Sequence, residues 1–162
     1  MSSIVYPRDE VRFPEAVHEA GLTSYRSTGE SWHFRSTGKP RRLGRLAHTL
    51  DQLVGRPAPL ATVRGHGPVA IGSSGILTLR SGLRRRIPYR VIRSRFIKPL
   101  HEAAASRGLY HLWTHPWNLA LPDSDALILL EDVCATANLL VERWDLQVLT
   151  MAEVARLEVQ SD

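Results

Sequence analysis

Apolar residues recur along the chain with two different periods, and these periods predict strands and helices in alternation. Short or alternating apolar runs bounded by turn-forming residues predict strands at residues 3–7, 23–26, 109–115 and 146–149. Spacings of three and four predict helices at residues 14–21, 41–54, 88–108, 124–145 and 151–157. Residues 27–40 read as a loop, and residues 67–77 as a strand running into a tight turn. About four strand–helix units follow one another, which predicts an α/β fold with a largely parallel sheet.

The ends of several helices carry their own signals. Gly21 and Gly108 are expected to end the helices at residues 14–21 and 88–108, and Thr150 to Glu153 form a capping box before the last helix. The stripe of the longest helix is predicted to contain Ala126, Leu130, Val133, Ala137, Leu140 and Trp144. Cys134 falls in the same helix, and we expect a buried, inert thiol. It is the single cysteine, which excludes a disulfide framework within the chain and a multi-cysteine zinc site.

Length and composition favour one globular domain over residues 1–162. The chain is 43% hydrophobic and 23% charged, which suits a soluble domain with a sizeable core. It contains no run of about 18 apolar residues, so no membrane span is expected. The start, "MSSIVYPRDEV", lacks the basic and apolar regions of a signal peptide, so a cytoplasmic location is predicted.

Positive charge is concentrated in one part of the chain. The formal net charge is +5, and no acidic residue lies between Asp51 and Glu102, where arginines are frequent. Such a field attracts polyanions, so one hypothesis is a non-catalytic binding module that holds nucleic acid or an acidic glycan through residues 80–98. The alternative is a solvated basic face. No helix-turn-helix, zinc-finger or RNA-binding aromatic motif accompanies the arginines, so nucleic acid is not the expected partner.

The segment "HLWTHPWNL", residues 111–119, is the densest in candidate chemistry. Alternation along a strand places His111, Trp113 and His115 on one face, and Pro116 leaves His115 at the carboxyl tip. Ligands of α/β folds bind at such tips, and an imidazole there can act as a general acid or base. Trp113 could line an apolar pocket, and Trp117 could stack on a sugar. The other interpretation is a ring-rich piece of hydrophobic core.

The two histidines of this segment are not expected to share a metal ion. On a strand their Cβ atoms lie about 13 Å apart. Metal–nitrogen bonds of about 2 Å cannot span that separation.

Several segments resemble one family of enzymes. "YHLWTHPWNL" and "LQVLTMAEVARL" resemble the C-terminal end of polysaccharide deacetylases of the NodB-homology type, which are carbohydrate esterases. "IVYPRDEV", "AVHEAGLTSYR" and "PVAIGSSGIL" are similar to the central part of these proteins. The resemblance implies a distorted (β/α) barrel, of which this chain forms the C-terminal half. It also implies metal-dependent hydrolysis of an N-acetyl or O-acetyl group on a carbohydrate, with a divalent metal such as zinc.

The resemblance also implies roles for individual residues. His115 matches the acid that protonates the leaving group, and Trp113 stands where an apolar residue, usually leucine, lines the acetate pocket. Arg26 matches an arginine at an earlier strand end, although the proline that usually follows it is absent. Substrate contacts are expected from Trp113, Trp117 and His111. The aspartate and tryptophan motif that tunes the family's histidine has no counterpart.

The metal-binding motifs of the family are also missing from this chain. Neither paired aspartates nor a separate His-x-x-x-His motif is present, and the spacing of His111 and His115 falls within the acid motif. No metal site is therefore expected unless a missing N-terminal half is supplied, by a partner chain or by an upstream reading frame. The isolated chain is expected to be incomplete or inactive. A third hypothesis is a non-enzymatic relic that folds as a homodimer, because half a barrel leaves open sheet edges.

Overall fold

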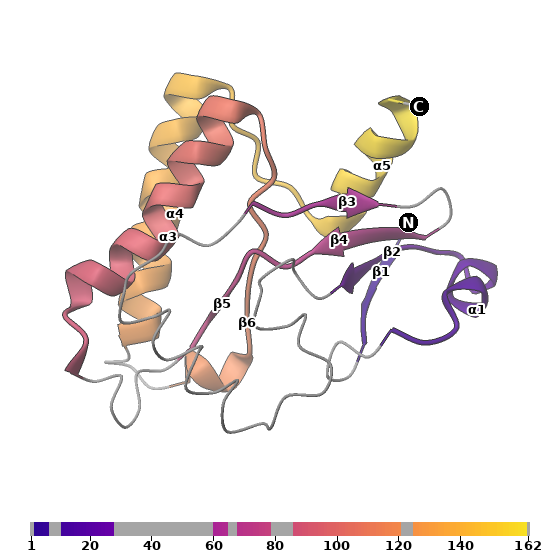
Figure 1. The fold of residues 1–162 in the computed structure, drawn as a ribbon, viewed down its shortest axis with the longest axis horizontal. Helices are drawn as coiled ribbons and strands as arrows, with labels where there is room; N and C mark the ends of the chain where they lie inside the picture. The colour runs from indigo at the N-terminus through magenta and orange to yellow at the C-terminus, as the bar shows by residue number, and fades with distance from the viewer. Residues whose placement is uncertain are drawn as a thin grey trace, which may run out of the picture.

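A computed structural model describes the chain over residues 2–6, 11–27, 60–64, 68–78, 86–120 and 125–161. Within these stretches strands and helices alternate, and helices pack on two sheets (Figure 1). The helix predicted at residues 41–54, most of the loop predicted at 27–40 and the arginines within residues 80–85 lie outside the described residues. In the described stretches, no helix combines the length and apolar character needed to cross a membrane.

The larger sheet holds four described strands in the order β1, β2, β4 and β3. Their bounds are Ser2–Val5 for β1, Leu22–Ser27 for β2, Val63–Arg64 for β3 and Val69–Gly72 for β4. β1, β2 and β4 run parallel, whereas β3 pairs antiparallel with β4. Helix α1 (Pro14–Glu19) lies between β1 and β2 in the chain and buries Val17. Gly21 follows α1 with a φ of 77°, which fits its predicted place at the end of this helix.

The smaller sheet pairs β5 (Gly75–Leu77) with β6 (Leu112–Thr114) in parallel. β5 follows β4 after only Ser73 and Ser74, so the chain passes from one sheet to the other at these two serines. The parallel strands therefore lie in the same order as in the sequence, which is the order found around a (β/α) barrel. Both sheets are open within the described residues, and the partial barrel remains a prediction.

Helices α3 (Tyr89–Ser106) and α4 (Asp125–Trp144) run side by side (Figure 1). Two groups of buried side chains join them to each other and to β5: Ile97, Leu100, Val133 and Leu140 in one, and Leu77, Ala126 and Leu129 in the other. α3 ends with Arg107 in the left-handed region, at a φ of 52°, so the cap predicted at Gly108 is wrong. A Cβ on Gly108 would lie 2.5 Å from Leu60 Cδ1, the movable end of that side chain, so this contact does not by itself require glycine.

The buried face of α4 is rotated from the predicted stripe. Its buried residues are Ala126, Leu129, Val133, Thr136 and Leu140, while Leu130 and Ala137 are only half-buried. Trp144 is 57% exposed and Cys134 is exposed as well, so the predicted burial of both is wrong. Successive helical residues differ by about 100° around the axis. Cys134 therefore points away from the core although Val133 before it points inward.

Helix α5 (Met151–Ser161) covers the larger sheet, with Ala155 packed against Val69 and Ile71. Its predicted capping box is confirmed. The Thr150 N–H donates to Glu153 Oε2 at 2.7 Å, and the Glu153 N–H donates to Thr150 Oγ1 at 3.3 Å. This short polar pattern caps the helix at its predicted start.

The strand predicted at residues 146–149 is wrong. Residues 145–150 form neither strand nor helix and pair with no described strand. Leu146 packs against the core between α3 and α4, whereas Val148 is 72% exposed. An apolar run becomes a strand only beside a backbone that satisfies its N–H and C=O groups.

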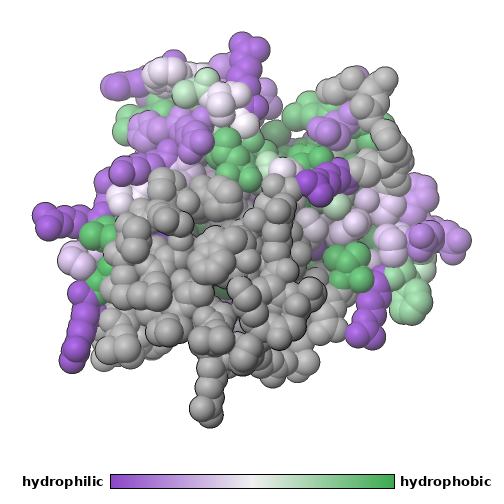
Figure 2. Space-filling model, viewed as in Figure 1, coloured by the Kyte–Doolittle hydropathy of each residue, from purple (hydrophilic) through white to green (hydrophobic). Residues whose placement is uncertain are grey.

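Apolar side chains are also exposed elsewhere on the surface. Figure 2 shows apolar side chains near α5, where Leu157 and Val159 are exposed, while hydrophilic side chains are scattered over α3 and α4. Exposed apolar patches often mark association sites. The homodimer remains a prediction.

Candidate functional site

Three rings follow one another at the end of β6. Trp113 lies in β6, His115 follows the strand, and Trp117 lies in the 3-10 helix η3 (Pro116–Asn118). The imidazole of His115 stacks on the Trp117 ring, with centroids 4.0 Å apart and planes 15° apart. The same imidazole meets Trp113 edge to face, with centroids 4.9 Å apart. Trp113 and His115 thus lie on the same side of the strand, as the alternation predicts.

Arg26 reaches this group from the carboxyl end of β2. Its Cζ lies 3.6 Å from the centroid of the Trp113 ring, and only 7% of the residue is exposed. A guanidinium at this position is attracted by the negative face of the indole. Arg26 lies in the larger sheet and His115 directly follows β6 of the smaller sheet, and both contact the Trp113 indole. We call Arg26, Trp113, His115 and Trp117 the ring stack.

Trp113 is also held by a hydrogen bond. Its Nε1–H donates to Ser73 Oγ at 2.7 Å, and Ser73 is one of the two serines between β4 and β5. Sequence reasoning missed Ser73, although polar residues directly after an apolar strand are a signal for strand-end chemistry. Trp113 is therefore held by two contacts within the protein: the Arg26 guanidinium over its ring and the Ser73 hydroxyl at its Nε1. Its place in an acetate pocket remains a prediction.

His111 lies at the opposite end of β6 and contacts the junction of β4 and β5. Its Nδ1 lies 2.9 Å from the Gly72 carbonyl oxygen. A carbonyl can only accept, so Nδ1 carries the proton. The backbone N–H of His111 donates to Ser74 Oγ at 3.1 Å, and its carbonyl accepts the Ser74 N–H at 3.0 Å. These bonds hold the strands together, and a substrate contact by His111 remains a prediction.

The His115 imidazole is held by its ring contacts. Within the described stretches no residue hydrogen-bonds its ring nitrogens. Those nitrogens are therefore not committed to a described protein group. An imidazole in this situation can exchange a proton with a bound molecule.

Metal ligands do not converge among the described residues. No three of their His, Cys, Asp or Glu side chains lie together as a group that could hold a metal ion. The described residues therefore supply no such group for the divalent metal that the resemblance implies. The metal-bearing half remains a prediction.

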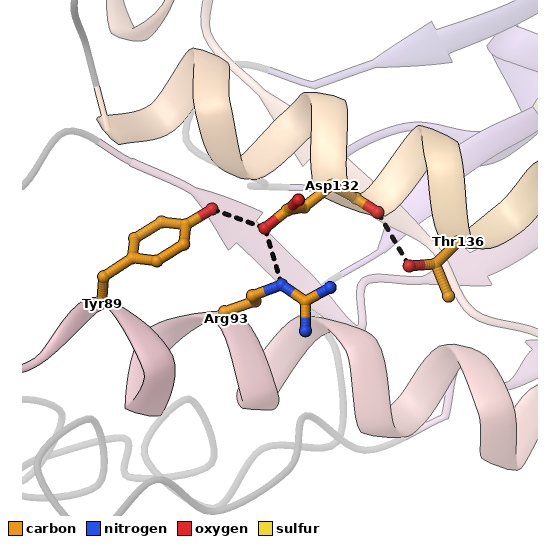
Figure 3. A network of polar contacts seen from close by, with 4 residues as sticks. All are labelled: Tyr89, Arg93, Asp132 and Thr136. Atoms are coloured by element: carbon orange, nitrogen blue, oxygen red, sulfur yellow. Dashed lines mark hydrogen bonds and ion pairs between the residues drawn. The ribbon is translucent and has the colours of Figure 1, made fainter.

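Part of the basic stretch serves the packing of α3 on α4. Asp132 Oδ2 accepts hydrogen bonds from Tyr89 Oη at 2.8 Å and from Arg93 Nε at 2.6 Å (Figure 3). We call these three residues the helix clamp. Hydrogen bonds from Tyr89 and Arg93 lower the pKa of Asp132, while burial and the bond to Asp132 raise the pKa of Tyr89 to about 12. Arg90 and Lys98 are exposed on α3, and polyanion binding there remains a prediction.

Comparisons with known proteins give no relative: no family model, curated protein or solved structure matches this chain.

Proposed function

We propose that this chain supplies the proton-donating and sugar-contacting part of a carbohydrate deacetylase site. The reaction is hydrolysis of an N-acetyl or O-acetyl group, which releases acetate and leaves an amine or a hydroxyl on the sugar. His115 donates the proton that the leaving nitrogen or oxygen takes up. Arg26 orients the Trp113 indole, which in turn contacts the His115 imidazole. The supporting observation is that Arg26, from the larger sheet, and His115, directly after β6, contact the same Trp113 indole.

The position of the ring stack supports this role. Arg26 lies near the carboxyl end of β2, Ser73 directly follows β4, and His115 directly follows β6. β2 and β4 are parallel to each other, as are β5 and β6. Loops and side chains at the carboxyl ends of parallel strands form the sites of α/β enzymes. The site is therefore where such a fold would place a catalytic acid.

Deacetylases of the resembled family also use a divalent metal, which activates the attacking water. Because the described residues do not group three potential ligands, no step of this proposal passes through such an ion. The ligands would come from another part of the assembled enzyme, such as a partner chain. We accordingly expect the isolated chain to release little acetate.

The test is acetate release from N-acetylglucosamine oligomers by the protein isolated from its own cells with its associated chains. Replacing His115 with alanine (His115→Ala) should lower the rate by about 100-fold or more, the usual contribution of a general acid. His101→Ala is the matched control, because His101 is an exposed histidine on α3. Equal rates for both variants, or no acetate release by the native assembly, would contradict the proposal.

A further inference from the structure

Trp117 is fixed in place although most of it is exposed. Trp117 is 64% exposed, yet its indole is stacked on the imidazole of His115. The turn that carries Trp117 is anchored by two hydrogen bonds of the next residue, Asn118. Asn118 is buried and its Nδ2–H donates to the Leu77 carbonyl at 3.1 Å, and the Asn118 N–H donates to the His115 carbonyl at 2.9 Å. These bonds fix the backbone on both sides of Trp117.

An exposed aromatic ring in this arrangement can bind a ligand at low entropic cost. One face of the Trp117 indole is covered by imidazole, so its exposed area lies on the remaining face and edges. A tryptophan has only two side-chain torsions to fix, and here the stacking already restricts them. The platform is therefore preorganised before any ligand arrives.

We propose that Trp117 is the specificity platform of this site and stacks on a pyranose ring of the acetylated carbohydrate. This inference rests on the proposed function and adds the residue that selects the substrate class. A pyranose presents a patch of C–H groups that packs on an indole face, while its hydroxyls remain in water. Because the imidazole covers one face of the indole, a sugar stacked on the other face is separated from His115 by the Trp117 ring. The stacked sugar is therefore a neighbour, in the carbohydrate chain, of the sugar that loses its acetyl group.

A nucleobase could stack on the same ring, but the described residues of the ring stack favour a sugar. Single-stranded nucleic acids need exposed cations beside the aromatic platform to meet their phosphates. The cation of the ring stack, Arg26, is buried and lies over Trp113 instead. An uncharged carbohydrate does not need that contact.

The test measures binding, so that it does not depend on turnover. Tri-N-acetylglucosamine is titrated into the full chain while the indole N–H and imidazole C–H resonances are followed by NMR. We expect shifts of the Trp117 and His115 signals, and Trp117→Ala should weaken binding about tenfold or more. Trp144→Ala is the matched control, since Trp144 is an exposed tryptophan on α4. It should leave the dissociation constant unchanged.

The outcomes separate this inference from the proposed function. Unchanged affinity in Trp117→Ala would overturn the platform, even if His115→Ala abolishes acetate release. Shifts of Trp117 with a short thymidine oligonucleotide but not with the sugar would overturn it in favour of nucleic acid. Sugar binding that depends on Trp117 would support the platform, whatever the deacetylase assay shows. A sugar that shifts neither ring would overturn it as well.

Discussion

The helix clamp and the ring stack use similar side chains in different ways. Both combine an arginine with aromatic rings. In the clamp, Tyr89 and Arg93 both donate to one carboxylate oxygen of Asp132, which joins α3 to α4. In the ring stack, contact is made through ring faces and edges, and no described residue binds the ring nitrogens of His115.

The difference separates a structural cluster from a candidate reactive one. In the clamp, charge and hydrogen-bonding groups are used to hold two helices, so a ligand would have to break existing bonds. In the ring stack, the Trp113 indole is held by a hydrogen bond to Ser73, whereas His115 is positioned by ring packing, which leaves its ring nitrogens uncommitted to described residues. Composition alone would not distinguish the two clusters.

The largest expected effect tests whether the helix pair and the ring stack are independent. Leu140→Ala removes a buried side chain between α3 and α4. It should lower the free energy of unfolding by about 2–5 kcal/mol, measured by urea denaturation. Leu139→Ala, at a neighbouring and 52% exposed position, should change it by less than about 0.5 kcal/mol. The Trp117 indole resonance should be unchanged in both folded variants, and a shift in Leu140→Ala would show that the two regions are coupled.

A smaller effect is expected from the hydrogen bond that holds Trp113 in the ring stack. Trp113→Phe and Ser73→Ala each remove one partner of that bond. A double-mutant cycle should give a coupling energy of about 0.5–1.5 kcal/mol in unfolding experiments. Trp113→Phe should also shift the His115 imidazole resonances, because their edge-to-face contact changes. Additive effects, with no coupling, would mean that packing alone positions the indole.

The smallest effect concerns the charge of the helix clamp. Asp132→Asn should cost at most about 1 kcal/mol at neutral pH, because Asp132 and Arg93 are both partly exposed. The pKa of Asp132 is lowered in the folded chain, so its stabilisation is present above about pH 4 and is lost as the pH falls through the folded pKa. Unfolding free energies at several pH values should therefore converge for wild type and Asp132→Asn in acid. Glu131→Gln, at the exposed neighbouring position, controls for the lost charge. An equal pH dependence in that variant would show that the clamp carries no specific stabilisation.

Local patterns predicted the elements well where the signal lies within a few residues. The capping box of Thr150 and Glu153 and the proline that ends β6 are read from adjacent positions, and the structure confirms both. The stripe of α4 was less well predicted, because Leu129 and Leu130 are equally apolar and only the neighbouring helix decides which one is buried. The prediction of a strand at residues 146–149 is wrong for a related reason. Leu146 packs against the core between α3 and α4 and Val148 is exposed, and neither lies beside a partner strand.

The sequence by itself determined the alternation of strands and helices and the placement of His115 directly after a strand, because periodicity and proline act locally. It also favoured Arg26, Trp113 and Trp117 as site residues. Only the tertiary structure decided that Arg26 lies on Trp113, that Ser73 holds the indole and that His111 serves the strand junction. These contacts join residues far apart in the chain, and they depend on which strands pair and in what register. No local pattern encodes that pairing, because it follows from the packing of the sheets and helices together.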